Sequence, residues 1–136
     1  MNLAFNLNQF RGDRIFFMET KPNSLIDGLF TKINYCDEQF TMNGICLTFP
    51  GGEPCLDRIR IDSVHYRSIC DIEQELLRTY VNARINKTIQ SKLGEALHAK
   101  SEIVGARAMK LNPVIVKISG IWENKLGHVG LSYRIM

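Results

Sequence analysis

Basic side chains concentrate in the second half of the chain, and the chemistry available to them is phosphate binding. Residues 1–77 hold seven Lys and Arg against eleven Asp and Glu, a net charge of −4. Residues 78–136 hold ten against three, a net charge of +7, so the chain's total of +3 hides the difference. Each Lys or Arg can neutralise one phosphate and release counterions without strict geometry. This asymmetry between the halves favours an anionic partner such as nucleic acid or a membrane surface.

Aromatic side chains matter because single-stranded nucleic acid stacks its bases on them. Core packing is favoured for most of them, since they occupy alternating strand positions beside aliphatic residues, as Phe30, Tyr35 and Trp122 do. Tyr66 and Tyr133 differ because each stands next to an arginine. The predicted nucleic-acid contacts are Arg78, Arg84, Lys87, Lys92, Lys100, Arg107, Lys110, Lys117, Arg134, Tyr66 and Tyr133.

Two other interpretations compete with nucleic-acid binding. The cations do not form one narrow stripe at 100° per residue, so they can also be the solvated face of a packed helix. Alternatively, the acidic first half and the basic second half suit contacts between copies of the chain or with an acidic protein. The apolar surface expected between Ile72 and Leu97 is wide enough to cover a sheet and to bind a neighbour. We therefore expect a homo-oligomer.

Catalytic and metal-binding patterns are weak. One acidic cluster with a histidine could hold a divalent metal for phosphoryl chemistry, but its spacing matches no motif and nearby arginines can pair with its acids. The cysteines contain no C-x-x-C pair and are expected to be buried thiols of a reduced protein. We expect no enzyme activity, cofactor or metal. The acidic cluster is Asp57, Asp62 and His65, and the cysteines are Cys36, Cys46, Cys55 and Cys70.

The elements that must position these residues are strands, one helix and a final hairpin. Period-two alternation predicts a strand-rich segment over 1–66, with a hairpin turn at Cys36–Gln39 and a bulge or a tight turn at Asn43-Gly44. The final hairpin is predicted over 113–136, where Val114, Val116, Ile118 and Trp122 share one face.

The helix is predicted over about 70–103, with Ser68 or Asp71 as its N-cap. Its apolar residues recur every fourth position, and such a repeat drifts by about 40° per step around the helix. The helix must therefore be wrapped on two sides or break near Gly94. The predicted fold is one α+β domain over 1–136. It is an antiparallel sheet or OB-like barrel of about six strands with one long helix before the C-terminal hairpin.

The leading hypothesis is a non-enzymatic nucleic-acid-binding protein that prefers single strands, DNA or RNA, and acts as an oligomer. A structural or adaptor protein is the alternative, and a metal-dependent nuclease is the third. The longest uncharged stretch, 39–52, is too short and polar to cross a bilayer about 30 Å thick. The first residues lack the pattern of a secretory signal. We therefore expect an intracellular protein of cytoplasm or nucleus, which includes a viral protein in its host cell, and no membrane partner.

Overall fold

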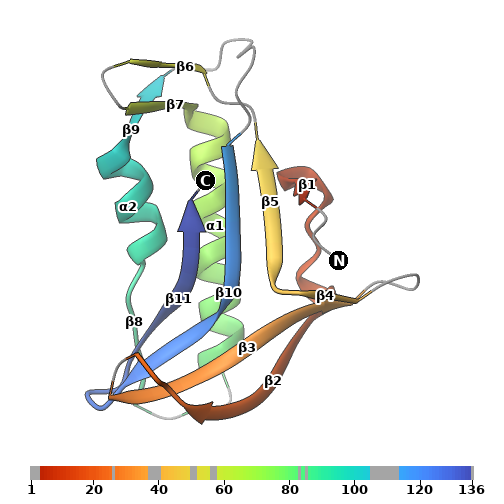
Figure 1. Ribbon diagram of the computed structural model, residues 1–136, viewed down its shortest axis with the longest axis vertical. Coiled ribbons are helices and arrows are strands. Elements are labelled where there is room, and N and C mark those ends of the chain that lie inside the picture. The colour runs from red at the N-terminus through yellow and green to blue at the C-terminus, as the bar shows by residue number, and fades with distance from the viewer. Residues whose placement is uncertain are drawn as a thin grey trace.

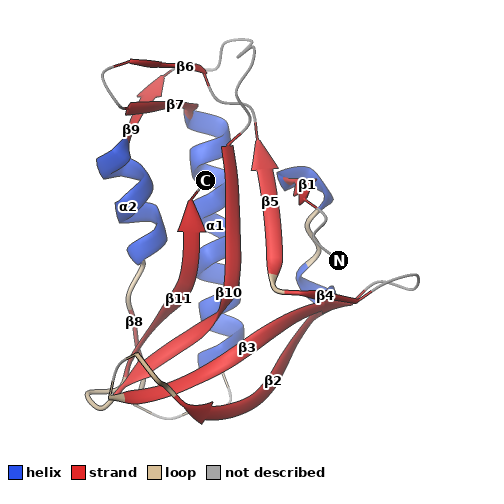
Figure 2. Cartoon of the chain, in the orientation of Figure 1, coloured by secondary structure: helices blue, strands red, loops and turns tan. Residues whose placement is uncertain are grey.

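The computed structural model describes residues 4–25, 27–36, 41–49, 52–55, 58–82, 84, 86–104 and 114–135. In this part of the chain a curved sheet covers a long helix, α1, and a second helix, α2, lies beside it (Figure 1). The α+β class is confirmed. Figure 2 separates the helices from the strands. The elements are β1 Ala4–Asn6, two 3-10 turns at Leu7–Gln9 and Gly12–Arg14, β2 Ile15–Pro22, β3 Gly28–Cys36, β4 Thr41–Asn43, β5 Ile45–Phe49, β6 Gly52–Cys55, β7 Arg58–Asp62, α1 Ser63–Val81, β8 Thr88–Ile89, α2 Lys92–Lys100, β9 Ser101–Val104, β10 Val114–Asn124 and β11 His128–Ile135.

Strand β10 is the centre of the larger sheet, which has eight strands among the described residues. One edge of β10 pairs with β11 along its length. The other edge pairs first with β5 and then with β3, both antiparallel. β2 pairs with β3, and the short β1 and β8 add parallel to β5 and β11. The sheet is open and mixed, so the barrel alternative does not apply.

The chain passes from β4 to β5 through Gly44, which has a φ of 81°. A side chain there would meet the Ile118 carbonyl oxygen, because its Cβ would lie only 2.7 Å away. Glycine accepts both the positive φ and the close approach. The predicted bulge at Asn43-Gly44 is thus a bend at which the strand changes partner from β3 to β10. The predicted turn at 37–39 lies outside the described residues.

Helix α1 buries one face against the sheet. Its buried residues recur at three and four, the spacing of an apolar helical stripe. Phe17 of β2 packs edge-on against Tyr80, with ring centroids 5.6 Å apart. The Tyr80 hydroxyl also lies 3.3 Å from the Thr31 hydroxyl on β3. We call the face of the sheet that packs on α1 the inner face. The buried helix residues are Ile69, Ile72, Glu73, Leu76, Leu77 and Tyr80.

The predicted helix over about 70–103 is two helices instead. α1 begins at Ser63 and ends at Val81, so Ser68 lies inside the helix and donates to the Val64 carbonyl rather than capping. The chain then extends into β8, which pairs with β11, and α2 begins only at Lys92. Asn86, with a φ of 60°, marks the break. The apolar residues that recur every fourth position are thus divided between two helices and a strand. The break in the helix lies before Gly94, not at it.

The final hairpin is confirmed by β10 and β11. About six strands were predicted, whereas eleven are present among the described residues, because several short ones carry no clear alternation. A separate three-stranded sheet of β6, β7 and β9 lies at the N-terminal end of α1 (Figure 1). Cys36, Cys46 and Cys70 are free thiols, half-buried rather than fully buried. Among the described helices, none has both the length and the apolar character needed to span a membrane.

Candidate nucleic-acid interface

The basic residues of the predicted helix do not share one surface with those of the hairpin. Arg78 is exposed on α1, behind the inner face of the sheet, and the Arg84 guanidinium lies 3.7 Å from the centre of the Tyr80 ring. Lys92 lies at the start of α2, 3.8 Å from Glu95. Arg107 and Lys110 lie outside the described residues, as does the side chain of Lys100. Arg78, Arg84 and Lys92 are thus scattered over the helical side of the fold.

Lys87 has a structural role that its sequence context did not reveal. Its Nζ lies 3.1 Å from Oε1 of Glu123, and both side chains are largely buried, with 24% and 8% exposed. Oε1 of Glu123 has no hydrogen-bond partner of regular geometry among the described residues, so Lys87 contributes by its charge. A buried carboxylate needs such a partner. Lys87 therefore stabilises Glu123 on the inner face of β10 and is not available to a phosphate.

Tyr66 and Tyr133 attach α2 to the rest of the fold. The Tyr66 hydroxyl donates to the Gly94 carbonyl at 3.2 Å, and the Tyr133 hydroxyl donates to the Lys92 carbonyl at 3.3 Å. Burial raises the pKa of both hydroxyls, with smaller contributions from neighbouring groups that include Glu73. These contacts hold both rings at the first turn of α2, so neither is a free stacking platform.

Glu73 of α1 also binds the first turn of α2. Its carboxylate, 1% exposed, accepts hydrogen bonds from the backbone N–H groups of Leu93 and Gly94 at 2.8 and 3.0 Å. Those groups have no partner within α2 because they belong to its first turn. Desolvation by burial raises the Glu73 pKa, and the two hydrogen bonds oppose that rise. The carboxylate of one helix thus caps the next.

The outer face of the sheet, opposite α1, carries a different set of residues. The strand registers place Lys21, Phe30, Trp122 and Gly130 in one row across β2, β3, β10 and β11. A second row holds Lys32, Gly120 and Ser132. A third places Lys117 opposite Arg134. We call these nine residues the outer platform.

Two glycines let the aromatic rings of the outer platform lie against the sheet. A Cβ on Gly130 would stand 2.5–2.9 Å from three atoms of the Trp122 indole, so the ring lies directly over Gly130. A Cβ on Gly120 would likewise stand 2.5 and 2.9 Å from the Phe30 ring. Both rings are half-buried and both line one pocket. Their remaining surface faces away from the core, which is the arrangement that base stacking requires.

Among the described residues, no acidic side chain forms an ion pair with the cations of the outer platform. The ion pairs of the described residues do not involve Lys21, Lys32, Lys117 or Arg134, and Glu19 is the acid that lines the same face. Lys117 and Arg134 face each other directly across two strands. Like charges in such a pair destabilise a sheet. An anion between them would remove that repulsion.

Of the predicted contacts, Lys117 and Arg134 lie on the outer platform, together with residues that the sequence did not single out. Phe30 and Trp122 were expected in the core. A bulge at Ser119 shifts the register between Ile118 and Gly120, and this turns Trp122 to the face opposite Ile118. The two strand glycines, Gly120 and Gly130, were the signal in the sequence, because Gly in a strand often marks a close approach.

Other candidate sites stay untested. The nuclease cluster cannot be assembled, because Asp57 and the side chain of Asp62 lie outside the described residues. No group of three or more metal-ligating side chains occurs among the described residues. The chain matches no protein-family model, and comparison with the curated proteins and with the solved structures gave no significant match. The geometry of the outer platform is thus what bears on function.

Proposed function

We propose that the protein binds single-stranded nucleic acid on the outer platform and is not an enzyme. The observation that carries the proposal is the pair of rings, Phe30 and Trp122, laid over Gly120 and Gly130 beside four unpaired cations. Stacking is tolerant of sequence because every base has a flat face. Lys21, Lys32, Lys117 and Arg134 would neutralise phosphates on either side of the rings.

Several features favour single strands over a duplex. The bases of a duplex are stacked on one another, so they cannot also stack on Phe30 and Trp122. The rings lie near one end of β10, and Lys117 lies five residues away, a separation of roughly 16 Å along a strand. A few unpaired nucleotides can span that distance with bases on the rings and phosphates on the cations. The sequence predicts binding through a basic helix and the C-terminal hairpin. The proposal retains the hairpin, as β10 and β11, and replaces the helix by β2 and β3.

The proposal is tested by fluorescence anisotropy of a labelled single strand across a salt series. Four cations that each contact one phosphate predict a slope of about −2.8 for log K against log salt, because each contributes about 0.7 on a single strand. The Lys117→Glu, Arg134→Glu double variant should lose most of the affinity and make the slope shallower. A duplex of equal length should bind more weakly than the single strand.

The matched control is Arg78→Glu, which reverses an exposed charge on α1, behind the sheet. It should leave the affinity close to that of the wild type, whereas the outer-platform variant should not. Equal losses in the two variants would mean that net charge alone drives binding, and an absence of single-strand binding at low salt would overturn the proposal. Self-association, the alternative drawn from the sequence, stays a prediction that size-exclusion mass can check.

A further inference from the structure

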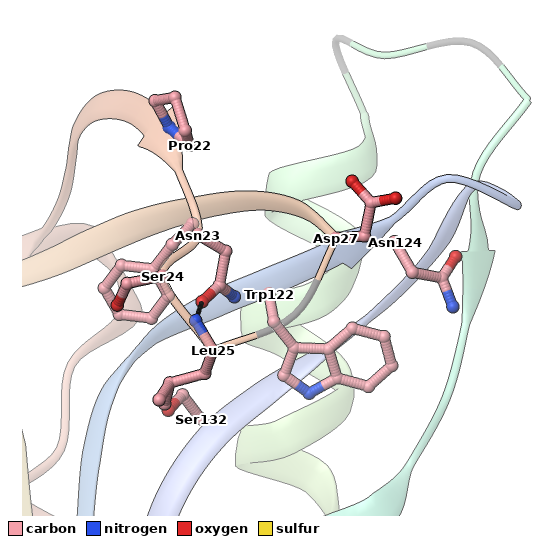
Figure 3. A pocket seen from close by; sticks show the side chains of 9 residues that line it. Pro22, Asn23, Ser24, Leu25, Asp27, Trp122, Asn124 and Ser132 are labelled. Carbon is pink, nitrogen blue, oxygen red and sulfur yellow. Dashed lines mark hydrogen bonds between the residues drawn. The ribbon is translucent and has the colours of Figure 1, made fainter.

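A pocket of about 650 Å³ opens beside the aromatic rings, under the segment that joins β2 to β3 (Figure 3). Its volume lies within the range of about 300–1,000 Å³ that is typical of small-molecule sites. We propose that this pocket holds one nucleobase and that guanine fits it best. The proposal deepens the proposed function and rests on it where the base belongs to a bound strand.

The apolar walls of the pocket suit a flat ring. Trp122 and Phe30 form one side, and Leu25, whose side chain is 90% exposed, stands at the opening. An exposed leucine beside two aromatic rings offers a base a second apolar surface. A base held there would stack on one side and displace water from Leu25 on the other.

The polar side chains that line the pocket are two amides, two hydroxyls and one carboxylate. Oδ1 of Asn23 accepts from the Leu25 N–H at 2.9 Å. Oδ1 of Asn124 accepts from the N–H groups of Leu126 and His128, each at 3.0 Å. Both amides therefore use their oxygen in a backbone turn, which leaves their NH₂ groups as donors. Asp27 supplies an acceptor, and Lys125 lies 2.6 Å from its Oδ2.

This set matches the hydrogen-bonding edge of guanine. That edge carries two adjacent donors, N1–H and N2–H₂, beside the acceptor O6. A carboxylate can accept both donors, while an amide NH₂ donates to O6. Asn124 pairs with Gly28, the neighbour of Asp27, so the two groups lie at the same rim. Adenine, cytosine and uracil each present a single donor group on this edge.

Trp122 is the single tryptophan of the chain, so its fluorescence reports on the pocket. The experiment titrates the protein with the four ribonucleoside monophosphates, and with single-stranded oligonucleotides of equal length that contain one guanine or none. Guanine-containing ligands should quench Trp122 and bind about tenfold more tightly than their counterparts, within the range expected for a bidentate base contact.

Asp27→Asn should abolish the preference for guanine and leave binding of the other ligands unchanged. The Asp27 side chain is 76% exposed, so the fold should tolerate the change. The control is Asp13→Asn, because Asp13 is also exposed and is paired with one exposed cation, Arg11, at 3.1 Å. This variant should keep the guanine preference.

The outcomes separate the pocket from the proposed function. If labelled strands bind and quench Trp122 but no base is preferred, the pocket proposal is overturned and the outer platform stands. If guanosine monophosphate quenches Trp122 in an Asp27-dependent way while strands do not bind, the pocket is supported as a free-nucleotide site and strand binding is overturned. If no ligand binds by either readout, both proposals fail.

Discussion

Replacing Lys87 with methionine should destabilise the protein strongly, although the residue looks like a surface cation in the sequence. The change leaves the Glu123 carboxylate, 8% exposed, without the ammonium that lies 3.1 Å away. Removing one partner of a buried ion pair destabilises a protein by about 3–5 kcal/mol. Because a quarter of the Lys87 side chain still reaches water, we expect about 2–4 kcal/mol. For a chain of this size, that corresponds to a fall in Tm of roughly 10 °C.

The assay is urea unfolding followed by circular dichroism, with Glu123→Met and the double variant completing a cycle. Replacing both partners by apolar residues of similar size is often close to neutral. The double variant should therefore be more stable than Lys87→Met alone. Lys125→Met is the control, because its pair with Asp27 is exposed on both sides and should contribute under about 1 kcal/mol. A loss in Lys87→Met no greater than in the control, or strict additivity in the cycle, would refute the argument.

Two further predictions concern Glu73, which caps α2, and Gly130, which lies under the Trp122 ring. Because burial raises the folded-state pKa of Glu73 above its unfolded value, the carboxyl stabilises the fold at low pH, and this contribution is lost as the pH rises through the folded pKa. The stability of the wild type relative to Glu73→Gln, measured by urea unfolding, should thus decrease with rising pH, and an increase would show that the pKa is lowered. Gly130→Ala should displace the Trp122 ring, because the new Cβ would meet that ring. The displacement should shift the Trp122 emission and weaken single-strand binding about tenfold. Unchanged Trp122 emission together with unchanged affinity would show that the position of the ring does not depend on a glycine at position 130.

The elements with regular alternation were predictable from the sequence. The hairpin of β10 and β11 was expected over 113–136, and Lys117 and Arg134 were expected to bind on it. A break near Gly94 was one of two alternatives, but the position of the break between Val81 and Lys92 was not predictable, because no proline marks it. Asn82, Asn86 and Thr88 were the signals, since these residues form helices weakly. The pairing of Thr88 and Ile89 with β11 overrides the apolar stripe that continues through Ile89.

The outer position of Trp122 was not predictable from the sequence, because of one extra residue in β10. Trp122 falls in the same alternation as Val114, Val116 and Ile118, so a regular strand would place it in the core. The bulge at Ser119 reverses that alternation and brings Trp122 to the outer face, where it lies over Gly130. A shift of one residue exchanges the two faces of a strand, and sequence periodicity does not reveal where such a shift occurs. The ion pair of Lys87 was not predictable for a related reason, because its partner Glu123 is distant in the sequence.

The central claim is that single strands bind on the outer face of the sheet. Backbone amide NMR during titration with a short unlabelled oligonucleotide tests it most directly, because every perturbed residue can be placed on the fold. The expected result is that shifts concentrate in β2, β3, β10 and β11 around Phe30, Lys117, Trp122 and Arg134, while the exposed side of α1 around Arg78 stays unchanged. Shifts centred on α1 and α2, or no saturable shifts at low salt, would contradict the claim.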